Sequence, residues 1–374
     1  MKLKIKKDVL LDSINWVSRV IVARPVLPIL SNVLLVAKDT SLTLSASNIE
    51  VSSKSEKLAN IEKPGEVIVQ GRLFAEVVKA LPNKDITLEL KGSKLVVESE
   101  NLHYSISCAP KDSYPDSTQM PKVLGSVETD LLLRSVQQVS VAAAKEENTP
   151  ILTAIKVEID NENITFSAID RYRIAKKIVA WKPKSKISST ITLLIKSKNL
   201  LEIIRGFESG GTVNIHFEEK NPNRVGFGAD DKTSILQLIS GDFPQTEQLF
   251  KDKYIEEIII EKDVFQEAIN SVSILTDQNV SIIFNIQKNV IKLSSQGNEE
   301  FNAENQIPCQ YTGKDIAIKF NSAYIKEGIA QFKSRYIIMK FDESTKPVEI
   351  VGADKPDGEL DIEYRYVIVP IRVT

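Results

Sequence analysis

Few residues in this sequence of 374 could carry chemistry. The two histidines, His103 and His216, each lie within an alternating strand-like stretch, which is typical of a strand surface rather than of a ligand or general base. The two cysteines, Cys108 and Cys309, show no CxxC spacing, so we expect two buried small hydrophobic side chains in a reducing compartment and no disulfide. No Gly-Lys-Ser/Thr sequence ends a glycine-rich turn, so the sequence contains no Walker phosphate loop.

Acidic clusters are the remaining candidates, because two-metal nucleases and polymerases need convergent carboxylates. One cluster comprises Asp354, Asp357, Glu359 and Asp361. Its spacing does not fit a calcium loop, and its Pro-Asp-Gly sequence favours a solvated hairpin loop. The other cluster comprises Glu299, Glu300 and Glu304, and it is typical either of a solvated strand end or of one half of a charged interface. We therefore predict no catalytic residues, no metal site and no cofactor.

A short pattern that occurs three times organises the chain. It consists of an Asp, apolar residues two, six and nine positions later, and a Ser at the tenth, and it begins at Asp8, Asp130 and Asp263. Intervals of four and three place the apolar side chains on one stripe of an α-helix. The Asp suits the N-cap, where its carboxylate accepts hydrogen bonds from free backbone N–H groups.

Other predicted elements recur in the same order around these helices. A strand precedes each helix, at residues 3–5, 127 and 258–260. Two strands follow it, at 33–36 with 42–46, 154–159 with 164–168, and 282–286 with 290–293. A further strand and a second helix come next, at 67–69 with 73–80, 191–195 with 199–207, and 316–320 with 323–332. Because these periods exceed those of solenoid repeats, we predict an α+β fold of three tandem domains, 1–120, 121–250 and 251–374.

The overall charge limits how such a protein could bind nucleic acid. Lys and Arg number 48 against 50 Asp and Glu, for a net charge of −2. Any DNA contact must therefore come from a local cationic surface. The first residues alternate charge and hydrophobe, which is typical of an edge strand and not of a signal peptide, and no apolar run is long enough to span a membrane. We expect a cytoplasmic protein without a membrane partner.

Four segments resemble the β subunit of bacterial DNA polymerase III, the sliding-clamp family. They are RPVLPILSNVLL at 24–35, IDRYRIA at 169–175, GDFP at 241–244 and YVIVPIR at 366–372, and they occur in the family's order. The resemblance implies three DNA-clamp domains per subunit, each with two helices packed on antiparallel sheets. It further implies a head-to-tail homodimer that forms a closed ring around double-stranded DNA of any sequence. Such a clamp is not an enzyme: it tethers the replicative polymerase α subunit, is opened by a clamp loader, and serves repair polymerases and other clients.

A protein that slides on DNA needs loose contacts between cations and phosphates rather than base contacts. We expect such cations on the exposed faces of the inner helices. The candidates are Arg24, Arg72, Lys79, Arg134, Lys196 and Lys198. Arg24 is the strongest, because the matching family position approaches DNA. For any single cation, an ordinary solvated helix face is the alternative.

The resemblance also implies how the ring closes. Tyr104 and Ile106 belong to an alternating stretch that we expect to be an edge strand of the first domain. The matching family surface meets the third domain of the partner subunit. In this chain that region holds Ile274 and Leu275, with Glu299 and Glu300 nearby. A paired edge explains exposed apolar residues that would otherwise favour aggregation.

The apolar chain end is unusual, since a fraying terminus favours polar residues. In the family, the matching positions form a hydrophobic groove for a short client peptide rich in Gln, Leu and Phe, and such anchors supply most of the binding energy. The apolar positions are Leu152, Ile169, Ile174, Pro244, Leu249, Val367, Ile368, Val369, Pro370 and Ile371, each of which could instead be ordinary core. Arg173 and Arg372 are expected to orient the peptide at the rim.

Three residues depart from the family pattern: Tyr172 replaces the usual His, Arg171 occupies a position that is commonly small, and Gln248 stands where some members have Arg. A bulky Arg171 either narrows the pocket or points to solvent, so these departures bear on peptide preference.

Two other kinds of protein are alternatives to a clamp. One is a polymerase or exonuclease that acts alone, and the other is a symmetric scaffold of β-rich modules unrelated to DNA.

Overall fold

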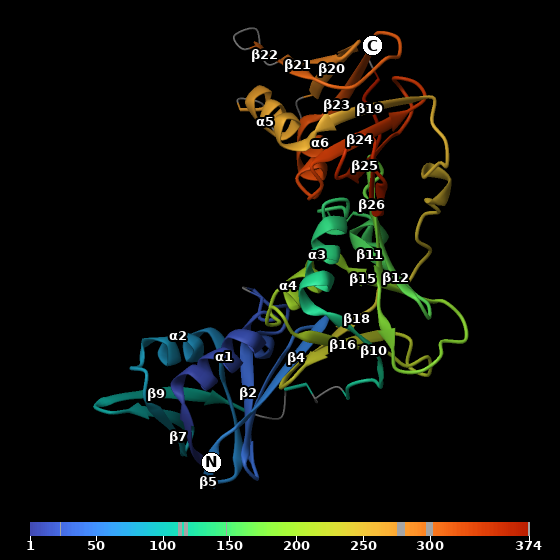
Figure 1. Cartoon of the computed structure of the whole chain (residues 1–374). Coiled ribbons are helices and arrows are strands. Elements are labelled where there is room, and N and C mark those ends of the chain that lie inside the picture. The colour runs from blue at the N-terminus through green and yellow to red at the C-terminus, as the bar shows by residue number, and fades with distance from the viewer. Residues whose placement is uncertain are drawn as a thin grey trace. The chain divides into compact units, whose positions relative to one another are not determined.

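The computed structural model describes residues 1–22, 24–110, 114–115, 119–146, 148–274, 281–296 and 302–372. The chain forms two compact units (Figure 1). Unit 1 comprises Met1–Leu132, Trp181–Lys186 and Asn199–Leu238, and unit 2 comprises Leu133–Ala180, Ile187–Lys198 and Ile239–Thr374. The middle third of the chain therefore contributes to both units.

Unit 1 is built on one antiparallel sheet of 14 strands. Their order is β14 (Lys182–Pro183), β10 (Val123–Glu128), β16 (Thr212–His216), β17 (Arg224–Ala229), β18 (Lys232–Gln237), β4 (Val51–Leu58), β3 (Ser41–Ser47), β2 (Asn32–Lys38), β6 (Gly65–Gln70), β9 (Leu102–Ala109), β8 (Lys94–Ser99), β7 (Asp85–Lys91), β1 (Lys2–Lys6) and β5 (Asn60–Lys63). The pairing of β18 with β4 joins strands of the second sequence copy to strands of the first.

Alternating hydrophobicity explains how this sheet packs. Successive side chains of a strand point to opposite faces, and in β2 and β3 every second residue is buried. Helix α1 (Lys7–Ser18) packs against β3, β4 and helix α2 (Gly71–Ala80), so the core lies between the helices and one face of the sheet.

Unit 2 contains two antiparallel sheets. The larger has the order β15 (Ile191–Lys196), β11 (Ala154–Ile159), β12 (Asn163–Ile169), β13 (Arg173–Ala180), β26 (Leu360–Ile368), β25 (Val348–Ala353), β24 (Tyr336–Phe341) and β19 (Glu256–Glu261). The smaller has the order β22 (Asn302–Pro308), β21 (Val290–Gln296), β20 (Ser281–Gln287) and β23 (Ile316–Asn321). The pairing of β13 with β26 joins the second sequence copy to the third.

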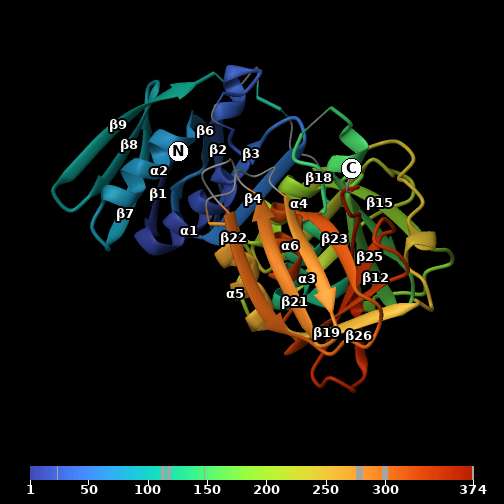
Figure 2. The ribbon, with the colours of Figure 1, turned by 90° about the horizontal axis from the view of Figure 1, so that it is seen from above.

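Helices cover these sheets as well. Helix α5 (Lys262–Val272) packs against β21, β22 and helix α6 (Ser322–Ile329), behind the strands seen in Figure 2. The phenylalanine rings of α5, β20 and β23 meet edge to face, with centroids 5.4 Å apart for Phe265 and Phe284 and 5.2 Å apart for Phe284 and Phe320. Helices α3 (Thr129–Ser140) and α4 (Ser197–Ile204) supply the second copy's pair, which completes the predicted α+β fold.

The threefold helix pattern is right about the apolar stripe and wrong about the cap. Helices α1, α3 and α5 each begin one residue before the Asp, which is therefore the second residue of the first turn. Lys6 and Glu261 stand at the N-caps of α1 and α5 without side-chain capping bonds. An Asp still suits this first turn because the free N–H groups there favour negative charge.

Within the described residues, three short 3₁₀ helices join these elements: η1 (Pro28–Ser31), η3 (Pro150–Thr153) and η4 (Glu247–Leu249). The first two repeat one another, with sequences PILS and PILT directly before β2 and β11. In each, the hydroxyl of the last residue donates to the carbonyl of the proline that begins the helix: Ser31 to Pro28, and Thr153 to Pro150, both at 2.7 Å. The sequence patterns considered above did not predict this repeat.

Candidate partner-binding and DNA-facing surfaces

The turn between β12 and β13 is the most tightly bonded part of the predicted partner site. Asp170 Oδ1 accepts the backbone N–H groups of Tyr172 and Arg173, each at 3.1 Å. The backbone of Asp170 also donates to the carbonyl of Arg173 at 3.3 Å. These bonds close a two-residue turn over Arg171 and Tyr172 and fix the direction in which both side chains leave it.

Arg173 lies beneath this turn and is only 2% exposed. Its Nε donates to Asp170 Oδ2 at 2.8 Å and its Nη1 to Glu327 Oε2 at 2.7 Å. The guanidinium also lies 4.2 Å from the centre of the Tyr324 ring. The prediction that Arg173 hydrogen-bonds a peptide at an exposed rim is therefore wrong. Paired carboxylates make it a positioning residue that ties the β12–β13 turn to α6.

Glu327 joins this network from the α6 side. Burial alone would raise the pKa of its carboxyl, but hydrogen bonds from Arg173 and Lys145 outweigh burial and hold that pKa below its usual value. Lys145 Nζ lies 3.0 Å from Glu327 Oε1. The sequence did not predict Glu327 or Tyr324 as site residues, because they lie far along the chain from the turn and no local pattern marks them.

An exposed aromatic and apolar surface sits above Arg173. The rings of Tyr172 and Tyr324 stack with centroids 5.9 Å apart, and Tyr172 is 55% exposed. The backbone N–H of Val369 donates to the Tyr172 carbonyl at 2.8 Å, and that of Ile371 donates to the Lys319 carbonyl at 2.7 Å. The chain end is thus held on both sides, which explains why apolar residues persist there. We call Tyr172, Tyr324, Val369 and Ile371 the terminal surface.

The predicted pocket residues separate into two groups. Leu152, Ile174, Val367, Ile368 and Pro370 are buried and form the support beneath the surface. Val369 and Ile371 are each 38% exposed, Arg372 is exposed, and Ile169, Pro244 and Leu249 are half-buried. Leu249 ends η4, which an ion pair of 2.8 Å between Lys176 and Glu247 ties to β13. Arg171 is exposed, and its Nη2 donates to Thr149 Oγ1 at 2.9 Å.

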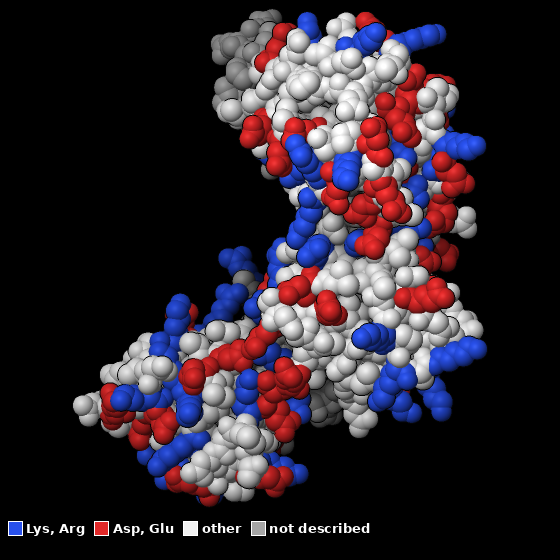
Figure 3. Space-filling view, in the orientation of Figure 1, with Lys and Arg blue, Asp and Glu red and all other residues white. Residues whose placement is uncertain are grey.

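The predicted DNA-facing cations are mostly solvent-accessible. Arg72 and Lys79 on α2, Arg134 on α3 and Lys198 on α4 are exposed, as is Arg24 in the loop before η1. Lys196 differs, because it is half-buried at the end of β15 rather than on a helix. Figure 3 shows Lys and Arg side chains around α2 in unit 1, among Asp and Glu side chains.

The predicted dimer-forming edge is present in unit 1. Strand β9 pairs with β8 from residue 102 to residue 107, whereas β6 contacts it only at Cys108 and Ala109. On the side away from β8, residues 102–107 have no strand partner within the described chain. Ile106 was predicted to face a partner, but it is 3% exposed and points into the core, while Tyr104 is half-buried. The edge therefore offers its backbone rather than Ile106.

The matching region of unit 2 is described in part. Strand β22 forms one edge of the small sheet, and Ile274, just after α5, is 73% exposed. Leu275, Glu299 and Glu300 lie outside the described residues.

The side chains that could carry chemistry have ordinary structural surroundings in the described residues. Both cysteines are free thiols, and burial raises the pKa of the Cys309 thiol to about 11. Cys108 was predicted to be buried as well, but it is only half-buried. His216 Nδ1 lies 2.9 Å from the Pro121 carbonyl, and burial lowers the pKa of its imidazole. Asp354, Asp357 and Glu359 are exposed between β25 and β26, as predicted for a hairpin loop, whereas Asp361, also exposed, is the second residue of β26. Among the described residues, no group of acidic, His or Cys side chains could hold a metal ion.

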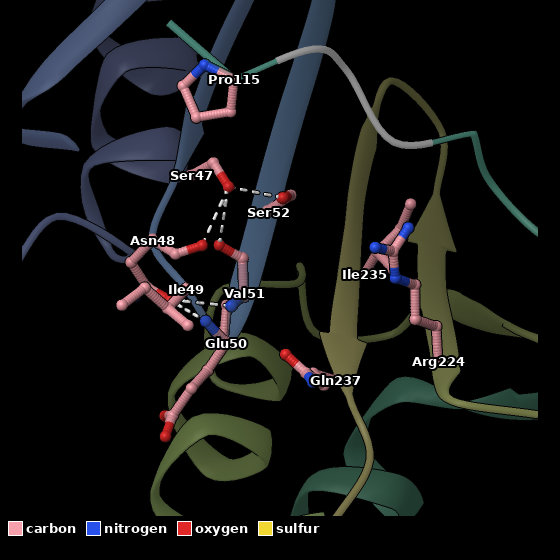
Figure 4. A pocket seen from close by; sticks show the side chains of 10 residues that line it. All are labelled: Ser47, Asn48, Ile49, Glu50, Val51, Ser52, Pro115, Arg224, Ile235 and Gln237. Atoms are coloured by element: carbon pink, nitrogen blue, oxygen red, sulfur yellow. Dashed lines mark hydrogen bonds between the residues drawn. The ribbon is translucent and has the colours of Figure 1, made fainter. Parts of the chain in front are cut away.

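A separate pocket of about 240 Å³ lies in unit 1, between the β3–β4 turn and strands β17 and β18 (Figure 4). The turn satisfies its own polar groups: Asn48 Oδ1 accepts from the backbone of Glu50 and Val51, each at 2.8 Å. Ser47 and Ser52 share a hydrogen bond of 2.7 Å. Arg224 lines the opposite wall. The residues that line this pocket include no pair of a nucleophile and a general base.

Comparisons with known proteins cover the whole chain. Models of the N-terminal, central and C-terminal domains of the DNA polymerase III β subunit match residues 1–119, 126–245 and 247–372. The chain is 30% identical over 376 residues to the β sliding clamp of Streptomyces coelicolor, with 100% of both sequences covered. It is 25% identical over 396 residues to the Bacillus subtilis clamp, again with 100% of both covered.

Solved structures agree on the fold. The Pseudomonas aeruginosa DNA polymerase III subunit β superposes with a TM-score of 0.91 at 23% identity, and the B. subtilis sliding clamp with a TM-score of 0.91 at 24% identity. Each comparison covers 100% of both chains. No helix in the described part of the chain is long and apolar enough to cross a membrane.

Three clamp domains in tandem, with helices on antiparallel sheets, define a DNA sliding clamp. The chain belongs to the family of DNA polymerase III β subunits, the β sliding clamps. These are non-catalytic processivity factors that act with DNA and a polymerase. Both alternatives, an independent enzyme and a scaffold unrelated to DNA, are thereby rejected.

Proposed function

We propose that two copies of this chain close head to tail into a ring around double-stranded DNA in the cytoplasm. The free backbone edge of β9 in unit 1 and the edge strand β22 in unit 2 support this arrangement, because two open sheet edges on one chain are complementary between copies. The family membership of the whole chain is the observation that carries the proposal.

Enclosure lets the ring hold DNA without binding a particular sequence. The exposed side chains of Arg24, Arg72, Lys79, Arg134 and Lys198 are suited to phosphate contacts, which carry no sequence information and re-form at every register. Lys196 is half-buried, so at most its terminal amine could contact a phosphate.

The terminal surface is the proposed receptor for client proteins. Its exposed Tyr172, Val369 and Ile371 offer apolar contacts, and the buried Arg173 network keeps them in place. The proposed clients are the replicative polymerase α subunit, the clamp loader, repair polymerases and other proteins that carry a clamp-binding peptide.

Retention on circular and linear DNA tests the ring. Protein loaded by its clamp loader onto a nicked circular plasmid should remain bound after the loader and free clamp are removed by gel filtration. Cutting the plasmid once should release most of it within minutes, because a ring slides off a free end. Equal retention on both forms would contradict enclosure and indicate a surface binder.

A further inference from the structure

The backbone at Arg171 is unusual for the residue that it carries. A two-residue turn between antiparallel strands favours φ above zero at its first central position, and glycine adopts that conformation most readily. Here that position is Arg171, with a φ of +80°. A side chain with a Cβ is strained there, so the sequence keeps an arginine where glycine would be relaxed.

The surrounding contacts hold this strained residue in place. Asp170 Oδ1 accepts hydrogen bonds from the backbone N–H groups of Tyr172 and Arg173. The Tyr172 ring is fixed by its stack on Tyr324. The turn therefore persists without help from the Arg171 side chain. Strain that a fold tolerates at a candidate binding site suggests that the side chain itself is used.

The guanidinium of Arg171 has spare hydrogen-bonding capacity. Its Nη2 donates to the neutral hydroxyl of Thr149 at 2.9 Å, and the guanidinium forms no ion pair with any described residue. Two carboxylates beside the turn are already engaged: Asp170 and Glu327 both bond Arg173, and Glu327 also bonds Lys145. No carboxylate of the described network neutralises Arg171, which leaves it available for an external anion.

The neighbourhood indicates the chemistry of that anion. Arg171 precedes Tyr172, whose carbonyl holds Val369, so a cation adjoins an exposed aromatic and apolar surface. A peptide that covers this surface with apolar side chains would bring its flanking residue to the guanidinium. Arginine binds carboxylates through two parallel N–H···O bonds, which gives both attraction and geometry.

We propose that Arg171 is a specificity-determining residue that selects client peptides with an Asp or Glu beside their apolar anchors. The proposal rests on the proposed role of the terminal surface as the client receptor. It names the class of client that this chain prefers, and it explains why arginine is kept at a position with positive φ.

Peptide pairs that differ only in charge test this selection. A fluorescent peptide rich in Gln, Leu and Phe is made in a neutral form, and Asp and its isostere Asn are placed in turn at each flanking position. Fluorescence anisotropy then gives dissociation constants for the full-length protein and for Arg171→Gly and Arg171→Lys. Arg171→Gly suits the backbone and should melt at the same or a higher temperature.

The wild-type protein should prefer Asp to Asn at one flanking position by about threefold to tenfold, and the preference should shrink in high salt. Arg171→Gly should bind the Asn peptide as the wild type does but lose the preference, and Arg171→Lys should keep only part of it. Unchanged preference in Arg171→Gly, or no preference in the wild type, would overturn the role of Arg171 while leaving the receptor intact. If no peptide binds the wild type, the receptor assignment fails and this proposal fails with it.

Discussion

Lys232 in β18 is a buried lysine, and a side chain of this type is normally paired with carboxylates when it is buried. Its Nζ lies 2.7 Å from Asp12 Oδ1, and Lys57 Nζ lies 3.0 Å from Asp12 Oδ2. Lys57 also bonds Asp231 at 2.8 Å. These pairs tie α1 of the first copy to strand β18 of the second within unit 1.

This network predicts a pH dependence of stability. Burial would raise the pKa of the Asp12 carboxyl, but the bonds from Lys232 and Lys57 outweigh it and lower that pKa. A carboxyl whose pKa falls on folding stabilises the fold above its unfolded pKa of about 4, and this stabilisation disappears as the pH falls through the folded value. Asp12→Asn should therefore reduce the free energy of unfolding at pH 7 by about 1 kcal/mol, since Asp12 is partly exposed, and by less at low pH.

Urea denaturation at pH 7 and near pH 3 measures this difference. Glu76→Gln is a matched control, because Glu76 is exposed in the middle of α2 and forms no ion pair with another described residue. An equal effect of Asp12→Asn at both pH values would contradict the role of its charge.

At the scale of elements, the segment that follows α5 should decide dimer formation. Replacing Ile274 and Leu275 together with Asp should yield monomers, because charge beside exposed Ile274 would have to be desolvated on association. Sedimentation velocity measures the result. Leu58→Asp, at an 81% exposed leucine of unit 1, is the control and should remain dimeric. A dimeric double variant would place the interface elsewhere.

The terminal segment allows a second test at this scale. Deleting Val369 to Thr374 removes the backbone bonds to Tyr172 and Lys319 but leaves β26, which ends at Ile368. Client peptides should then bind at least tenfold more weakly in anisotropy assays, or not at all, whereas sedimentation should still show a dimer. Retained peptide affinity in the truncated protein would disprove the receptor assignment.

These elements also show what a sequence can predict. The apolar stripes through Leu10, Leu132 and Phe265 predicted three helices correctly, because burial depends on period. The prediction that the Asp residues are N-caps was wrong, because the helices begin one residue before each Asp. The residues at the N-caps of α1 and α5, Lys6 and Glu261, form no side-chain capping bond. The segment motifs located the β12–β13 turn and the chain end, but burial of Arg173 depends on Glu327 and Tyr324, which only the fold brings to it.

At the scale of the whole molecule, attraction to DNA is expected to come from many weak contacts. Replacing Arg24, Arg72 and Lys79 together with Ala should weaken DNA association, and the log–log slope of affinity against salt should become shallower by about 0.9 for each cation–phosphate pair that the substitutions remove. Filter binding over a salt series measures the slope. Lys38, Lys63 and Lys94, which are exposed on strands, provide a control with the same change in charge. An equal effect of both triple variants would assign the attraction to net charge alone.

The strands of the middle copy are divided between two sheets, and this has a consequence for fragments of the chain. A protease that cut the connection at residues 251–255 would not release an independent piece, because β13 on one side of the cut is hydrogen-bonded to β26 on the other. The nicked polypeptide should stay together until denatured. For the same reason, two separately expressed segments divided at that point should find each other and reconstitute the larger sheet, whereas either one alone would expose an unpaired strand and tend to precipitate.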